Sequence, residues 1–216
     1  MSDEKGFTLV ELLVAVTILA FVLAGMYQGI NNLSSTAVEA EERVVNLDEA
    51  RVLMATVTKD LRTATRLEST VSPFLYADER QIIFHANIYT NTGPNRVTVF
   101  VDGTNQFVEQ TVAPNAGSCP NCTYTGTGTT RVVGRWVANP TTQPIFRFFD
   151  GTGAQVAAPL SDPLEAGDPA ELAILRTIES VEVNLSIRRT QTIGSKGTTL
   201  INRVRLPNVD YNPPTS

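Results

Sequence analysis

The sequence is poor in cysteine and histidine, and it has no excess of positive charge. Its 216 residues include two cysteines, Cys119 and Cys122, and a single histidine, His85. Two cysteines are too few for a disulfide scaffold, so the fold must rest on a hydrophobic core. A single histidine excludes metal sites built from several histidines. The net charge of −5 gives no electrostatic reason to expect nucleic-acid binding.

What the sequence does have is one long apolar run near its N-terminus. Between Phe7 and Ile30 only Glu11 and Tyr27 are ionisable. The stretch from Phe7 to Met26 is long enough, at about 1.5 Å per residue, to cross a hydrocarbon layer of about 30 Å. The run is apolar on all sides, which excludes an amphipathic helix lying on a membrane surface. The sequence therefore predicts a membrane-spanning helix.

A removed secretory signal is the second interpretation of such a run. It would have a positive N-terminal region, a shorter apolar core and a small-residue cleavage site after that core. Here the segment from Met1 to Gly6 is more acidic than basic, and Ala20, Ala24 and Gly25 lie inside a continuing helical pattern. We therefore expect the apolar segment to remain in the mature protein.

A specific motif opens the apolar run, Gly6-Phe7-Thr8-Leu9-Val10-Glu11. It resembles the processing site of type IV pilins and type II secretion pseudopilins, in which a glycine, a phenylalanine and an acid stand at fixed offsets from a membrane helix. The resemblance implies that a prepilin peptidase cuts between Gly6 and Phe7 and methylates the new amino group of Phe7. The six-residue leader is lost, and the apolar helix stays on the mature chain.

The same resemblance implies where the protein is found and what it contacts. It is expected to cross the cytoplasmic (inner) membrane once with its head outside, and then to enter a cell-surface or periplasmic filament. Its expected partners are the prepilin peptidase, other minor and major pilins or pseudopilins, the inner-membrane assembly platform, and membrane lipid before assembly. No cofactor is expected.

Glu11 is an acid within a membrane-length segment, and such residues usually mark function. An isolated carboxylate in a low-dielectric medium is several kcal/mol unfavourable unless it is paired or neutralised. In a filament of packed helices, Glu11 would meet the Phe7 amine of a neighbouring subunit and so set its axial register. The alternative is that Glu11 reaches the membrane interface from near the helix end.

Two glycines, Gly25 and Gly29, also stand out in the apolar run. Their spacing matches the small-xxx-small pattern that lets helices approach closely. Each glycine also lowers helix stability by roughly 1 kcal/mol relative to alanine. The pattern is therefore compatible with close helix packing and with a helix that loosens at this point.

The helical pattern continues beyond the apolar run to about Arg66. Phe7 to Arg66 would span on the order of 90 Å as one straight helix. We expect an apolar stripe to face a globular domain, and charged residues, among them Lys59, Asp60 and Arg62, to form a solvated face. The stripe recurs in steps of three and four: Leu47, Ala50, Met54, Val57, Leu61 and Ala64.

After Ser72-Pro73 the period of the pattern changes from 3.6 to 2, which indicates strands. The Ser180–Arg188 segment alternates cleanly, so one sheet face should be solvated. The predicted fold class is α+β: a long N-terminal transmembrane helix whose second half packs on an antiparallel β-sheet head. The expected strands are 81–89, 96–101, 106–112, 131–137, 144–149, 180–188 and 199–206. The chain is expected to divide into four parts. They are a leader (1–6), a transmembrane and filament-core helix (7–30), an amphipathic second half of that helix (31–66), and a head with a loose tail (67–216).

A weaker resemblance covers much of the rest of the chain. Lys59-Asp60-Leu61-Arg62, the Phe146–Gly151 hairpin and the Ile178–Arg189 strand are similar to J-type minor pseudopilins and PilW-like minor pilins. A major pilin is usually shorter and often has a C-terminal disulfide loop, which this chain lacks. The resemblance implies a minor pilin that helps initiate or cap a filament. The alternatives are a J-type minor pseudopilin of a type II secretion system and, from another class, a single-pass membrane-anchored extracytoplasmic binding protein.

Cys119-Pro120-Asn121-Cys122 is a C-x-x-C sequence. A redox motif would normally open a helix, but no helical pattern follows here. A zinc knuckle would need a second ligand pair. We therefore expect a short structural disulfide in an exported domain.

The sequence also contains an acidic loop with Asp162, Glu165 and Asp168. Oxygen ligands on a loop suit calcium, but this spacing matches no defined calcium loop, and an ordinary solvated loop is the simpler interpretation. His85 and Trp136 lie in predicted strands and are expected to be structural. No nucleophile elbow or phosphate loop occurs, so no enzyme is predicted.

Overall fold

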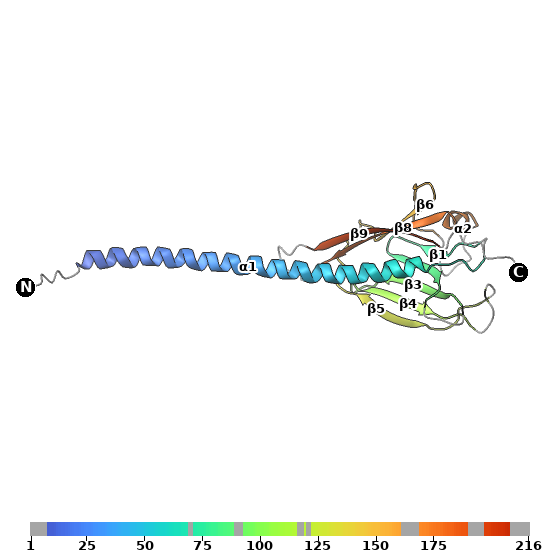
Figure 1. Ribbon diagram of the computed structural model, residues 1–216, viewed down its shortest axis with the longest axis horizontal. Helices are drawn as coiled ribbons and strands as arrows, with labels where there is room; N and C mark the ends of the chain where they lie inside the picture. The colour runs from blue at the N-terminus through green and yellow to red at the C-terminus, as the bar shows by residue number, and fades with distance from the viewer. Residues whose placement is uncertain are drawn as a thin grey trace, which may run out of the picture. The chain divides into compact units, whose positions relative to one another are not determined.

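The structure is a computed structural model, and it describes residues 8–68, 71–88, 93–115, 119, 122–160, 169–189 and 197–207. The chain divides into two compact units, Met1–Glu42 and Arg43–Ser216. The first unit contains only the beginning of one long helix, α1, and all the strands belong to the second unit (Figure 1). Each unit is described by itself below.

Helix α1 runs from Leu9 to Arg62. In the first unit its side chains from 8 to 41 are all exposed. In the second unit it becomes amphipathic, because buried residues recur in steps of three and four. That buried stripe consists of Asn46, Ala50, Leu53, Met54, Val57, Asp60 and Leu61.

The end of α1 is set by pairing with a strand. The backbone N–H of Thr65 donates to the carbonyl of His85 (2.8 Å), and Ala64 forms an isolated bridge with Ala86. The chain after Arg62 therefore leaves the helical hydrogen-bond pattern and joins the sheet edge. This is why α1 ends before the expected Arg66.

The first sheet has five antiparallel strands in the order of the chain, β1-β2-β3-β4-β5. The turn from β3 to β4 is fixed by Asp102, whose carboxylate accepts the N–H groups of Thr104 (2.9 Å) and Gln106 (2.8 Å). Asn105 in this turn has φ of 60°, a conformation that asparagine tolerates. The strands are β1 (Phe74–Ala77), β2 (Gln81–Ala86), β3 (Asn95–Val101), β4 (Phe107–Val112) and β5 (Thr129–Gly134).

The second sheet is also antiparallel and has the order β7-β6-β8-β9. A second acid-capped turn joins β6 to β7, where the Asp150 carboxylate accepts the N–H groups of Thr152 and Ala154, both at 2.9 Å. A short helix, α2 (Pro169–Leu175), precedes β8. The strands are β6 (Phe146–Asp150), β7 (Gln155–Val156), β8 (Ile178–Ile187) and β9 (Thr198–Arg205).

The second half of α1 lies between the two sheets (Figure 1). On one side Leu53 packs against Gly134 of β5, where an added Cβ would come within 2.9 Å of the leucine. On the other side the Asn202 side chain of β9 donates to Thr58 (3.0 Å). Phe107 of β4 and Phe146 of β6 meet edge to face at 6.1 Å, so one apolar core joins both sheets and the helix.

The predicted fold class is confirmed, with several differences in detail. The strands form two sheets rather than one, and β1, β7 and α2 were not expected. Strand β5 ends at Gly134 rather than Val137 because Trp136 has φ of 59°, which no regular strand allows. The predicted solvated face of β8 was wrong at two positions, because Ser180 and Asn184 are buried.

Candidate processing and assembly site

The start of α1 is capped by Thr8. The N–H of Glu11 donates to the Thr8 hydroxyl (3.3 Å), and the N–H of Leu12 donates to the Thr8 carbonyl (3.2 Å). Threonine followed three residues later by glutamate is the spacing of a capping box, which satisfies the free N–H groups of a first helical turn. Thr8 was not predicted as a cap, although its spacing from Glu11, just before an apolar run, was the signal for it.

Glu11 lies in the first turn of α1, where the helix dipole favours a negative charge. Its side chain is exposed, and no lysine, arginine or histidine occurs between Thr8 and Glu42. Within the described part of the chain, no basic group lies within ion-pair distance of Glu11. The described residues therefore supply no positive partner for this carboxylate.

The surface of α1 from Leu12 to Met26 is apolar on every side. Its large side chains are exposed, from 47% for Val22 to 76% for Phe21. Among the described residues α1 is the one helix long and apolar enough to cross a membrane. The hydroxyl of Thr17 donates to the carbonyl of Leu13 (2.7 Å), so it needs no partner outside the helix. Such a surface fits hydrocarbon or the helices of other subunits.

Gly25 and Gly29 lie within continuous helix. An added Cβ at either position would meet no heavy atom within 4 Å. Packing among the described residues therefore gives no reason for glycine at these two positions.

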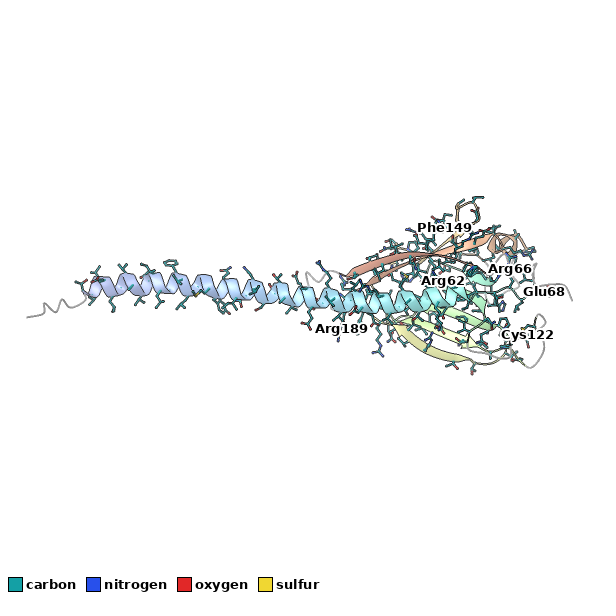
Figure 2. The ribbon with its side chains drawn as sticks, in the orientation of Figure 1. Arg62, Arg66, Glu68, Cys122, Phe149 and Arg189 are labelled. Carbon is teal, nitrogen blue, oxygen red and sulfur yellow. A yellow bond between two sulfur atoms is a disulfide. The ribbon has the colours of Figure 1, made fainter. Side chains whose placement is uncertain are left out.

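Several predicted site residues lie outside the described residues: Gly6, Phe7, Asp162, Glu165 and Asp168. The structure joins Cys119 and Cys122 in a disulfide. Figure 2 shows Cys122 and Arg189 toward opposite ends of the second unit. In the described ranges no group of three or more His, Cys, Asp or Glu side chains is placed to hold a metal ion.

His85 lies buried on β2 beside the disulfide segment. Its ring is 5.2 Å from that of Tyr124, and the Tyr124 hydroxyl donates to the carbonyl of Pro94 (2.7 Å). Burial lowers the pKa of His85 to about 4, and the positive charge of Arg96 adds to this effect. His85 is therefore neutral near pH 7.

A buried charged cluster in the second unit was missed by sequence analysis. Asp60 of α1 and Glu109 of β4 are 2% and 1% exposed, and Arg131 of β5 reaches both. The predicted solvated position of Asp60 was wrong: it follows Leu53 and Val57 by steps of three and four, so it belongs to the buried stripe. That spacing was the available signal.

The N-terminal geometry agrees with the comparison to known families. The family model of the prokaryotic N-terminal methylation motif matches residues 1–27. The chain carries this motif. The motif supports a type IV pilin or pseudopilin, processed by a prepilin peptidase and assembled with other pilins. No curated protein and no solved structure matches the chain.

The methylation motif ends within the first unit of the structure, so it includes the helix cap, Glu11 and Gly25 and none of the strands. Together with the exposed apolar helix it supports membrane anchoring with a C-terminal head. Thr8, the cap, is the second residue after the expected cleavage position. A mature chain beginning at Phe7 would thus place its new amino group one residue before the cap.

Proposed function

We propose that the chain is a minor pilin, a structural subunit that helps to initiate or cap a type IV pilus filament after a prepilin peptidase has removed residues 1–6. The methylation motif at residues 1–27, on a helix whose side chains from 8 to 41 are all exposed, carries the proposal. In this proposal residues 7–30 span the membrane before assembly and enter the filament core afterwards. Residues 31–66 connect this segment to the head, 67–216. The subunit has no catalytic role.

The proposed role of Glu11 follows from charge balance. Residues 8–42 contain no basic side chain, so a Glu11 carboxylate buried in a filament would lack a nearby partner on its own helix. The methylated amine of Phe7 on a neighbouring subunit supplies that positive charge. A slip of one subunit along the filament axis would leave two buried charges unmatched, which is strongly unfavourable. The pair therefore specifies register.

Assignment as a minor rather than a major subunit rests on weaker support. The two cysteines lie at 119 and 122, in the middle of the chain, and not in the C-terminal disulfide loop that is frequent in major pilins. The Lys59–Arg62, Phe146–Gly151 and Ile178–Arg189 segments resemble minor subunits. A minor subunit is expected in small amounts, with a large effect on how many filaments form.

The experiment that tests the proposal deletes the gene and measures surface filaments after shearing from the cells. We expect few or no filaments in the deletion strain, restoration by the wild-type gene, and small amounts of the protein in the sheared fraction. Unchanged filaments with the protein absent from that fraction would refute the proposal. Loss of protein secretion with normal pili would instead assign the chain to a type II secretion system as a J-type minor pseudopilin.

Complementation with Glu11→Ala tests the register argument separately. We expect normal membrane insertion but at least a tenfold loss of the protein from sheared filaments. Glu39→Ala is the matched control, because Glu39 is an exposed acid on the same helix beyond the apolar run. Equal incorporation of the Glu11→Ala and Glu39→Ala chains would contradict the proposed pair.

A further inference from the structure

The buried cluster of Asp60, Glu109 and Arg131 has more acid than base. The Arg131 Nη2 atom is 2.6 Å from Glu109 Oε2 and 3.8 Å from Asp60 Oδ2. Glu109 has a second donor, because the Thr111 hydroxyl donates to its Oε1 (3.1 Å). Asp60 Oδ1 is buried and accepts no hydrogen bond from the described residues. Arg131 is thus closer to Glu109 than to Asp60, and the Oδ1 atom of Asp60 has no donor among the described residues.

A proton accounts for this arrangement. The two buried carboxyl groups both lie against the same Nη2 atom of Arg131, and the negative charge of each disfavours ionisation of the other. A protonated Asp60 has an O–H group that can donate to Glu109, whereas an ionised Asp60 has none. One neutral carboxylic acid, one carboxylate and one guanidinium then sum to zero charge.

We propose that Asp60 and Glu109 share one proton in the folded chain, and that this proton clamps the last turns of α1 to strand β4. Loss of the proton leaves two buried carboxylates facing one arginine. Asp60 lies just before α1 ends at Arg62, so the contact that weakens is the one between the end of the helix and the five-stranded sheet. The clamp lies wholly within the second unit and does not depend on which filament the chain joins.

The charged groups around the pair support this protonation state. Burial raises the pKa of Asp60 to about 7, and the hydrogen bond and negative charge of Glu109 act in the same direction. Arg131 from β5 and Lys59 from α1 oppose the rise. The pKa of Glu109 lies below its ordinary value, because its bonds to Arg131, Asp60 and Thr111 outweigh the effect of burial.

The expected pH dependence follows from these directions. The folded chain keeps the Asp60 proton to about pH 7, whereas the unfolded chain loses it near pH 4. The stabilisation is therefore complete below about pH 4 and is lost as the pH rises through about 7. Asp60→Asn imitates the protonated acid at every pH, because its amide can donate to Glu109. The variant should be more stable than the wild type at pH 8 and nearly equal to it at pH 4.

The test uses the full-length protein in detergent and follows thermal unfolding by the fluorescence of Trp136, the single tryptophan. We expect Asp60→Asn to raise the melting temperature at pH 8 by roughly 5 °C or more, and the difference to vanish towards pH 4. Asp48→Asn is the control, because Asp48 lies exposed on the same helix and pairs with Arg51. That variant should show no such change with pH. A difference for Asp60→Asn that is constant with pH, or a loss of stability at pH 8, would overturn the proposal.

A spectroscopic measurement covers the case in which Asp60→Asn fails to fold. The infrared C=O stretch of a protonated carboxyl group should be present in the wild type at pH 6 and lost by pH 9. Glu109→Gln removes the neighbouring negative charge and should move the midpoint of this loss to lower pH. The proposal is wrong if the band is absent at pH 6 or if its midpoint is the same in Glu109→Gln.

Discussion

At the residue scale, the two buried groups with the largest pKa shifts respond to pH in opposite directions. Burial raises the pKa of Asp60 to about 7, so this group favours folding at low pH. His85 has a pKa of about 4 in the folded chain and about 6.5 when unfolded. Between these values the unfolded chain binds the additional proton, so His85 lowers stability as the pH falls from about 6.5 to about 4.

We predict that His85→Phe removes this acid sensitivity. Phenylalanine keeps a ring against Tyr124 but takes up no proton. The wild type should lose roughly 3 kcal/mol of stability relative to the variant between pH 7 and pH 4. Denaturant unfolding at several pH values, followed by tryptophan fluorescence, measures the difference. Curves for the two proteins that stay parallel across this range would contradict the prediction.

At the element scale, the second half of α1 is fixed by close contact with both sheets. One close contact joins Leu53 to Gly134 of β5, because an added Cβ on the glycine would lie 2.9 Å, 3.2 Å and 3.3 Å from three leucine atoms. The residue is glycine here because the helix leaves no room for a side chain. Neither residue has a polar role, so the contact is purely one of packing.

We predict that Gly134→Val destabilises the second unit by about 1–3 kcal/mol, the usual range for overpacking. Thermal unfolding of the full-length protein measures the effect. Gly103→Ala is the matched control, because no heavy atom lies within 4 Å of an added Cβ there. If the two variants melt at the same temperature, the packing account of α1 against β5 is wrong.

The apolar half of α1 allows a parallel test of its glycines. Space beside Gly25 is open within the chain, and we expect a neighbouring helix to use it in a filament. Gly25→Leu should then reduce incorporation into sheared filaments much more than Gly25→Ala, with normal membrane insertion of both. If Gly25 instead serves to loosen the helix, the two variants should impair incorporation equally, because leucine and alanine each stabilise the helix relative to glycine.

Periodicity predicted the long elements of this fold and missed the short ones. Helix α1 and strands such as β3 and β8 were found because their patterns run for many residues. Strand β7 has two residues and α2 has seven, too few for either period to emerge. The division into two sheets depends on which strands pair with one another across long stretches of sequence. The alternation of side chains along a strand does not indicate which strand it pairs with.

The candidate site was predictable to a similar extent. Glu11 was identified because a carboxylate is unusual in an apolar run. The acid pair was not identified, because Glu109 lies 49 positions after Asp60 and only the folded chain brings them together. Asp60 alone had a local signal in its spacing from Val57. The sequence indicated functional residues whose signal lies within one helix or strand. It did not indicate residues that come together only when different elements pack.

At the scale of the whole molecule, the two units have different properties. The first unit has an exposed apolar helix with one acid near its start and no basic side chain from 8 to 42. The second unit has its own core and contains all the described ion pairs. The methylation motif lies in the first unit. Partner choice is therefore expected to depend on the second unit, and entry into a filament on the first.

The central claim is that the chain is a prepilin whose mature N-terminus is Phe7. Intact mass and N-terminal sequencing of the protein, purified from cells that contain a prepilin peptidase, test it most directly. Gly6→Val is the control and should stay uncut, since it changes only the residue before the expected cleavage. The account predicts a wild-type chain that lacks residues 1–6 and begins with N-methylated Phe7. A wild-type chain that still begins at Met1 would contradict it.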